Sequence, residues 1–154
     1  MALPPFQAFF AAHRREVLRV LAGIVGPHEA DDCFQESFLA ALRAYPTLAP
    51  DADLRGWILT IARRKAFDAL RARARRPVPV AEPADRPGPP APDGRPELWE
   101  AVAALPLKQR AALVLRFVAD LPHADIARVL ETSEEAARRN VHEGLRKLRQ
   151  RRFT

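Results

Sequence analysis

The sequence lacks the features that mark secreted and membrane-spanning proteins. Its 154 residues include one cysteine, Cys33, so no internal disulfide can form and no cysteine cluster is available for a structural zinc. This composition fits a reducing cytoplasm. No apolar run approaches the ~18 residues of a membrane span, and no basic leader precedes an apolar stretch near the N-terminus. We therefore expect a cytoplasmic protein that is neither secreted nor inserted in a membrane.

The sequence also has little that would support catalysis. It contains no glycine-rich phosphate loop and no grouping of a nucleophile with a general base. Asp31, Asp32 and Glu36 have a spacing that could place carboxylates on one helical face. However, the four histidines are scattered over other predicted helices and none accompanies them. We expect no enzymatic activity, no cofactor and no metal site.

Proline divides the chain into two parts. Eight of the fifteen prolines fall between Pro77 and Pro96, a stretch that cannot form a continuous helix. We therefore predict a first domain over 1–76, a proline-rich linker over 77–96, and a second domain over 97–154. The linker is expected to be disordered or partly polyproline II when free. Domains this small are marginally stable alone, so we expect partners to contribute to their order.

Positive charge is concentrated in the two domains. The net charge of +6 divides into +4 for 1–76 (twelve basic and eight acidic residues), −1 for the linker (two and three) and +3 for 97–154 (eleven and eight). Two basic domains joined by a spacer fit two separate nucleic-acid contacts better than one continuous cationic surface. At ~3.1 Å per residue the extended linker would span up to roughly 60 Å, enough to place those contacts one to two turns of DNA apart.

Apolar residues at helical spacing predict three helices in the first domain. The first, over 5–25, ends at Gly26-Pro27. The second, over about 28–44, ends before Pro46. Its expected inward-facing residues are Cys33, Phe34, Phe38, Ala41 and Leu42, and its outer face carries Asp32, Gln35 and Glu36. Cys33 is interpreted as a packing residue, with redox sensing as the alternative.

The third predicted helix, over 53–76, combines an apolar stripe with a run of arginines. Asp51 or Asp53 is expected to cap it. Its buried face is predicted to contain Leu54, Trp57, Ile58, Ile61, Ala62 and Ala69, and its charged residues include Arg55, Arg63, Arg64, Lys65 and Arg71. A helix this basic fits a surface for a phosphate backbone, and the alternative is an ordinary solvated arginine face.

The second domain is predicted to contain helices over 97–104, 106–118 and 122–130, followed by a turn and a long last helix. Glu131 and Thr132 form the turn, and Thr132 or Ser133 caps the last helix, with Thr132 and Glu135 fitting a capping box. In that helix Ala137, Val141, Leu145 and Leu148 are expected to face inward, and Arg138, Arg139, His142 and Arg146 outward. This is the arrangement of a helix-turn-helix DNA reader. The alternative is a basic interaction bundle.

Two long segments resemble a known family. The segment PHEADDCFQESFLAALRAYPTLAPDADLRGWILTIARRKAFDALR is similar to region 2 of the bacterial sigma-70 family. The segment LWEAVAALPLKQRAALVLRFVADLPHADIARVLETSEEAARRNVHEGLRKLR is similar to region 4. Two regions with a short linker resemble the extracytoplasmic-function group of RNA polymerase sigma factors. The resemblance implies an all-α fold of two small helical domains, a region 2 bundle and a region 4 helix-turn-helix, joined by a flexible linker.

The resemblance also implies roles for residues of the first domain. Asp32, Gln35 and Glu36 match the segment that grips core RNA polymerase, where acidic and amide groups suit arginines of a partner. The alternative is a merely solvated patch. The third helix matches the part that holds melted minus-10 DNA, and the loop over 45–53 matches the one that receives a flipped base. The expected minus-10 contacts are Arg55, Trp57, Arg63, Arg64, Lys65 and Arg71, with Trp57 either a wedge or part of the core.

In the second domain the resemblance implies that the last helix reads the minus-35 duplex. The expected contacts are Ser133, Glu134, Glu135, Arg138, Arg139, His142 and Arg146. Glu134 or Glu135 either accepts from a cytosine amine or only favours the helix N-terminus. The chain departs from the family pattern in three places: Arg64 replaces a frequent Asn, Glu131 replaces the turn Gly, and Glu135, Ala136 and Ala137 replace a frequent Gly-Thr-Val.

Together these features predict a sigma factor that binds core RNA polymerase and directs promoter recognition, DNA melting and transcription initiation. Its expected partners are core RNA polymerase, promoter DNA and, by family resemblance, an anti-sigma factor. Two alternatives are a stand-alone helix-turn-helix regulator and a sigma-like interaction protein without promoter activity.

Overall fold

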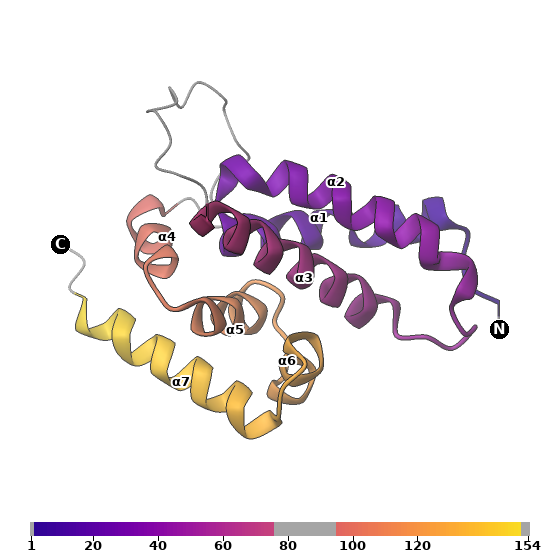
Figure 1. Ribbon diagram of the computed structural model, residues 1–154. Helices are drawn as coiled ribbons and strands as arrows, with labels where there is room; N and C mark the ends of the chain where they lie inside the picture. The colour runs from indigo at the N-terminus through magenta and orange to yellow at the C-terminus, as the bar shows by residue number, and fades with distance from the viewer. Residues whose placement is uncertain (1, 76–94, 152–154) are drawn as a thin grey trace.

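The computed structural model describes residues 2–75 and 95–151 (Figure 1). The described residues are helical and contain no strand, which confirms the predicted all-α class. Most of the predicted linker over 77–96 lies outside the described residues. The domain boundaries that we drew from its prolines therefore stay a prediction.

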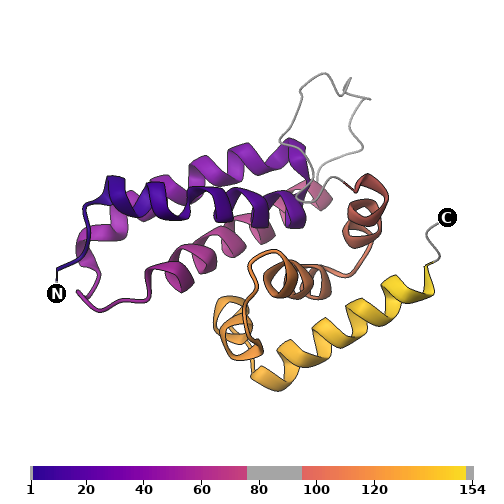
Figure 2. The ribbon, with the colours of Figure 1, turned by 180° about the vertical axis from the view of Figure 1, so that it is seen from behind.

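The N-terminal lobe consists of three helices and one short turn of 3₁₀ helix. These are α1 (Phe6–Val25), α2 (Pro27–Ala44), η1 (Tyr45–Thr47) and α3 (Leu54–Arg75). The three helices pack pairwise against one another, and the view from behind shows α1 along one side of the pair formed by α2 and α3 (Figure 2). Gly26, at φ 88°, separates α1 from α2, as Gly26-Pro27 predicted. Asp53 caps α3 by accepting from the Gly56 N–H at 3.2 Å.

Aromatic rings form the core at one end of this lobe. Phe9 is 1% exposed, and five rings lie with their centroids 5.2 to 6.0 Å from its own. They belong to Phe6, His13, Phe38, Tyr45 and Trp57. The Tyr45 hydroxyl also donates to the Pro4 carbonyl at 2.5 Å. The N-terminal segment and the loop after α2 are thereby attached to one buried cluster.

The C-terminal lobe contains the predicted helix-turn-helix. Its helices are α4 (Pro96–Ala103), α5 (Leu107–Phe117), α6 (His123–Leu130) and α7 (Glu134–Gln150). Ser133 caps α7 by accepting from the Ala136 N–H at 3.1 Å. The cap is therefore Ser133, and the proposed capping box of Thr132 with Glu135 was wrong. Glu131 adopts the left-handed conformation, at φ 56°, in the turn position where the family usually has Gly.

Two predictions of side-chain burial were wrong. Leu42 was expected to face inward, but it is 51% exposed. Arg63 was counted among the charged residues outside the buried face of α3, but it is only 8% exposed. The buried strip of α3 also includes Leu59, Ala66 and Phe67, which the apolar stripe omitted. The reason is that α3 is covered on one side by α1 and α2 and on another by α6, so its buried strip is wider than one helical face.

The two lobes pack against each other, with α3 on α6 and α1 on α4 and α5 (Figures 1 and 2). At this boundary a Cβ on Gly23 would lie 2.9 Å from Cγ2 of Val114, so only glycine allows the observed approach. Three arginines donate across the boundary to backbone carbonyls. Arg110 Nη1 donates to Ile24 O at 2.9 Å, Arg63 Nε donates to Val129 O at 2.9 Å, and Arg55 Nη2 donates to Ala119 O.

The burial of Phe9 predicts a large effect of truncating it. Phe9→Ala should lower the free energy of unfolding by about 3 to 5 kcal/mol, because it removes a fully buried ring and leaves a cavity. The measurement is urea denaturation followed by Trp fluorescence and helical circular dichroism. Phe117→Ala is the matched control, since it deletes the same ring from a side chain that is 59% exposed. It should cost no more than about 0.5 kcal/mol. Equal losses in the two variants would contradict the core assignment.

Candidate nucleic-acid interface

The outer face of α2 presents a mixed acidic and apolar surface. Asp32, Gln35 and Glu36 are all exposed there, as predicted. Leu39 and Leu42, each 51% exposed, continue the same stretch of helix. The apolar part was missed because a leucine three or four residues from other apolar residues was assigned to the core. Exposed leucines beside charged groups are typical of a surface that a protein partner covers.

On α3 the first arginine is held by both lobes. Arg55 forms a forked ion pair with Glu16 of α1, with Nε to Oε1 at 2.7 Å and Nη2 to Oε2 at 2.9 Å. The hydrogen bond to Glu16 raises the pKa of Arg55. Arg55 also donates to Ala119 O, just beyond the end of α5. In this state its guanidinium is engaged and not free for a phosphate.

The next two arginines of α3 converge on a single carboxylate of the turn in the helix-turn-helix. Arg64 Nε lies 2.7 Å from Oε1 of Glu131, and Arg63 Nη2 pairs with the same oxygen. The hydrogen bonds from Arg64 and Arg63 lower the pKa of Glu131 to about 2. We refer to Arg63, Arg64 and Glu131 as the α3–turn cluster. Two predicted minus-10 contacts thus lie against the C-terminal lobe.

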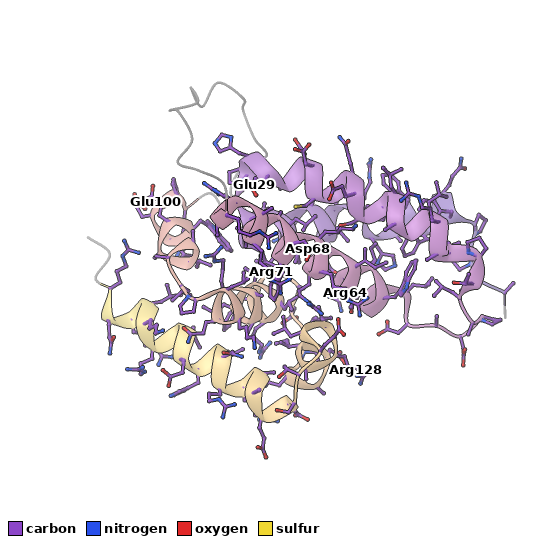
Figure 3. The ribbon with its side chains drawn as sticks, in the orientation of Figure 1. Glu29, Arg64, Asp68, Arg71, Glu100 and Arg128 are labelled. Atoms are coloured by element: carbon purple, nitrogen blue, oxygen red, sulfur yellow. The ribbon has the colours of Figure 1, made fainter. Side chains whose placement is uncertain are left out.

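The remaining predicted residues of α3 lie apart from this cluster. Trp57 is half-buried, with its ring centroid 5.7 Å from Phe9 and 6.2 Å from Tyr45, which supports its interpretation as part of the core. Lys65 is half-buried. Arg71 is exposed and pairs with Asp68 at 3.2 Å, one turn along the same helix (Figure 3). A pair this exposed contributes little to stability, so Arg71 is free to exchange partners.

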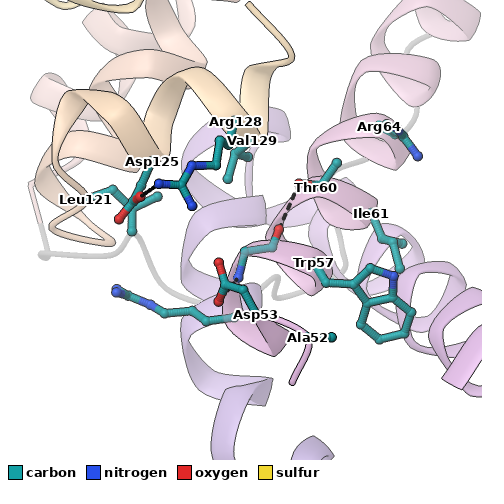
Figure 4. Close-up of a pocket in the computed structure, with 12 residues that line it drawn as sticks. Ala52, Asp53, Trp57, Thr60, Ile61, Arg64, Leu121, Asp125, Arg128 and Val129 are labelled. Atoms are coloured by element: carbon teal, nitrogen blue, oxygen red, sulfur yellow. Dashed lines mark hydrogen bonds and ion pairs between the residues drawn. The ribbon is translucent and has the colours of Figure 1, made fainter. Parts of the chain in front are cut away.

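A cavity of about 490 Å³ lies between the lobes beside the α3–turn cluster. Trp57, Thr60 and Arg64 of α3 line one side, and Asp125 and Arg128 of α6 line the other (Figure 4). Ala52 and Asp53, the end of the loop that was predicted to receive a flipped base, also line it. The cavity therefore brings predicted minus-10 residues of α3 and of the preceding loop next to α6 residues that the sequence assigned to no DNA contact.

The outward face of α7 is basic and open, as predicted. Arg138, Arg139, His142 and Arg146 are all exposed. Arg138 pairs with Glu134 at 2.8 Å, and Arg146 pairs with Glu143, each within the helix. The side chain of Arg139 makes no ion pair or hydrogen bond with other residues in the described ranges. The α7 helix runs along the edge of the C-terminal lobe, where nothing in the described chain covers this face (Figure 1). Such a face can enter a major groove.

Comparison with known proteins decides the family. The family model for Sigma-70 region 2 matches residues 9–76, and the model for Sigma-70, region 4 matches residues 95–148. The chain belongs to the sigma-70 family. Its members are non-enzymatic. The predicted order of region 2 and region 4 is confirmed, with the N-terminal lobe containing the first and the C-terminal lobe the second.

Relatives place this sigma factor in the extracytoplasmic-function group. It is 32% identical to RNA polymerase sigma factor CarQ of Myxococcus xanthus over 94% of this chain and 87% of the relative. It is 29% identical to ECF RNA polymerase sigma factor SigE of Mycolicibacterium smegmatis over 96% of this chain and 62% of that protein. It is 38% identical to ECF RNA polymerase sigma factor SigG of Mycobacterium tuberculosis, where the match covers 49% of this chain and 20% of SigG.

Solved structures share the fold. The sigma factor RpoE from Bartonella quintana, in complex with the anti-sigma factor NepR, matches with a TM-score of 0.77 at 17% identity over 94% of both chains. CnrH, in complex with the cytosolic domain of CnrY, matches with a TM-score of 0.70 at 20% identity over 94% of this chain and 85% of that one. Both likenesses concern the arrangement of helices.

The described ranges, 2–75 and 95–151, bear on two of the expected absences. No helix there has the length and apolar character needed to cross a bilayer. No group of three His, Cys, Asp or Glu side chains there has an arrangement suited to a metal ion.

The environment of Cys33 predicts slow reaction with thiol reagents. Burial and the carboxylates of Glu29, Glu36 and Asp32 raise the pKa of Cys33 from 9.0 to about 11, and the residue is 3% exposed. At pH 8 the thiolate fraction should therefore be about a hundredfold lower in the folded chain than in the unfolded one. Alkylation by iodoacetamide, followed by mass spectrometry with and without concentrated urea, measures this ratio. Equal rates would instead support redox sensing.

Proposed function

We propose that this sigma factor binds core RNA polymerase and directs it to promoters, where it supports DNA melting and transcription initiation. The observation that carries the proposal is the occurrence of two different surfaces in one sigma-70 chain. One is the acidic and apolar face of α2, and the other is the open basic face of α7. A stand-alone DNA reader needs only the second surface.

The face of α2 is proposed as the contact with core polymerase. Asp32, Gln35 and Glu36 supply acceptors for arginines of the partner, and Leu39 and Leu42 supply apolar area that becomes buried on binding. This combination of an apolar centre with charged neighbours fits a reversible protein interface. It adds Leu39 and Leu42 to the residues that the sequence predicted.

The basic residues of α3 are proposed as the contact with melted minus-10 DNA. Arg71 is exposed now, whereas Arg55, Arg63 and Arg64 would have to leave their present partners to reach a strand. Lys65 extends this basic track. A cationic track with an aromatic residue nearby is the usual means of holding a single strand.

The outer face of α7 is proposed as the minus-35 reader. Ser133, Glu134 and Glu135 lie at the helix N-terminus, which is the end that meets base edges in a helix-turn-helix. Arg138, Arg139, His142 and Arg146 lie farther along and suit phosphate contacts or guanine edges. Glu134 is committed to Arg138 at 2.8 Å in the free chain. A base contact by Glu134 would therefore require this ion pair to break.

An anti-sigma factor is proposed as a further partner. The support is the RpoE structure, which shares this fold and was solved with the anti-sigma factor NepR. The exposed faces of α2 and α7 are the surfaces that such a partner would have to cover. A cytoplasmic location follows from the proposed partners, because polymerase and chromosomal promoters are found there.

Run-off transcription with purified core RNA polymerase and a library of genomic fragments tests the proposal. The wild-type chain should co-elute with core and produce promoter-specific transcripts. The double variant Asp32→Lys, Glu36→Lys should lower core affinity by about a hundredfold or more, because it opposes the partner's positive charge. The matched control is Glu97→Lys, Glu100→Lys, which makes the same charge change at exposed positions of α4.

The outcomes separate the three functional candidates. A chain that binds duplex DNA but not core would be a stand-alone regulator. A chain that binds core but activates no promoter would be an interaction protein. Equal loss of core binding in the α2 variant and in the α4 control would show that the α2 face is not the specific contact.

The proposed phosphate contacts of α7 predict a change in salt dependence. If the chain neutralises about five phosphates, raising salt from 50 to 200 mM should weaken duplex binding by roughly 500-fold. The double variant Arg138→Ala, Arg139→Ala should lower the slope of log affinity against log salt by about 1.8. Titrations of the full chain against a promoter duplex by fluorescence anisotropy measure the slope. Arg14→Ala, Arg15→Ala, at exposed positions of α1, should leave it unchanged; equal reductions would argue against α7 as the reader.

A further inference from the structure

Glu131 occupies a backbone position that disfavours its own residue type. It lies between α6 and α7 at φ 56°, a conformation that glycine adopts without strain and other residues rarely adopt. The turn itself does not require a carboxylate there. The carboxylate instead reaches out of its lobe to Arg63 and Arg64 of α3. The side chain therefore has a role outside the turn that offsets its unfavourable backbone geometry.

We propose that Glu131 is a latch that holds the two lobes closed and keeps Arg63 and Arg64 away from DNA until the lobes separate. The part of this proposal that concerns DNA rests on the function proposed above for α3. The closed state itself rests on the contacts between the lobes. Glu131 would act as a substitute for a phosphate, because it offers the same arginines an anionic oxygen with similar hydrogen-bonding ability.

The geometry shows why the closed state excludes strand binding by Arg63. The Arg63 side chain is buried between α3 and α6, with Nε on Val129 O at 2.9 Å and Nη2 on the Glu131 carboxylate. Two of its nitrogens thus have partners in the other lobe. A phosphate can reach this guanidinium only after α6 moves away from α3.

Arg64 is the more accessible member of the cluster. Its side chain is 57% exposed, and its Nε is the atom bound to Glu131 at 2.7 Å. Arg63 is the second partner of the same Glu131 oxygen, Oε1, so both ion pairs that join α3 to the turn end on one carboxylate. Removing that carboxylate therefore removes both ion pairs at once and leaves the bond from Arg63 Nε to Val129 O as the remaining contact of these two arginines with the turn and α6.

The latch is built to open reversibly. The Glu131 side chain is 47% exposed, so water and salt compete with its two ion pairs. Three further bonds across this boundary run from arginines to the backbone carbonyls of Ile24, Ala119 and Val129. Each of these bonds has a charged donor and a neutral acceptor, whereas both groups are charged in the pairs with Glu131. Glu131 thus supplies the carboxylate of both ion pairs with Arg63 and Arg64. One substitution at this position removes both pairs and leaves the two arginines intact.

Glu131→Gly tests the latch without endangering the fold. Glycine is the residue that the left-handed turn favours, so this variant should fold at least as well as the wild type. The chain offers a closely matched control in Asp120, which also has a positive φ, 55°, and pairs with Arg116 of its own lobe at 3.5 Å. Asp120→Gly makes the same change of charge and backbone in the same lobe, but it breaks no ion pair between lobes.

The measurement is the distance distribution between nitroxide labels at Thr47 and Gln150, exposed positions of different lobes, in a Cys33→Ala background of the full chain. Double electron–electron resonance should show that Glu131→Gly lowers the ratio of closed to open chains by about tenfold, because two charge-assisted hydrogen bonds are lost. Asp120→Gly should give the wild-type distribution. Unchanged distances in Glu131→Gly, or equal opening in both variants, would overturn the latch.

Binding of a fluorescent single-stranded oligonucleotide by the same variants gives the second readout. Glu131→Gly should raise affinity by about the same factor as the shift toward open chains, and Asp120→Gly should not. An open Glu131→Gly chain with wild-type affinity would refute the claim that the latch masks strand-binding arginines. Failure of wild-type run-off transcription alongside a shifted distance distribution would instead refute the proposed function and leave the latch in place.

Discussion

Arginine side chains that donate to free carbonyls at helix ends hold the two lobes together. The last carbonyls of a helix have no partner within it. In α6 the turn N–H groups of Thr132 and Glu131 satisfy Ala127 O and Arg128 O, which leaves Val129 O for Arg63. Ile24 O near the end of α1 is satisfied by Arg110 in the same manner. These bonds join the lobes together with the ion pairs of Glu131, and they bury Arg63 between α3 and α6. The planar fork of arginine is suited to make them.

Periodicity was sufficient to predict the elements and their order. The helices, the stop at Gly26-Pro27 and the outward basic face of α7 each follow from local rules about spacing, caps and breakers. The residues on α7 were placed correctly because that helix packs on one side only, so inward and outward positions alternate in a single pattern. Family resemblance then identified regions 2 and 4, which the family models confirm.

The same local rules could not predict the contacts between the lobes. Arg63 looked like a surface charge, since its burial depends on α6, which is more than sixty residues away in the chain. Leu42 was predicted to be buried, because its spacing matches that of core residues and nothing in the local sequence indicates that this face of α2 stays exposed. The departure at Glu131 was visible, but its cause lies in two arginines of another helix. Each miss concerns a residue whose environment is set by tertiary packing.

The openness of α7 in the closed chain has a consequence for timing. Its basic face is exposed while Arg55, Arg63 and Arg64 are engaged elsewhere. Under the proposed function, intact upstream duplex is therefore the first DNA that the chain can hold, and the separated strand follows only after the lobes part. A chain arranged in this way would select promoters through the order of its contacts: it binds double-stranded DNA before it can retain an opened strand.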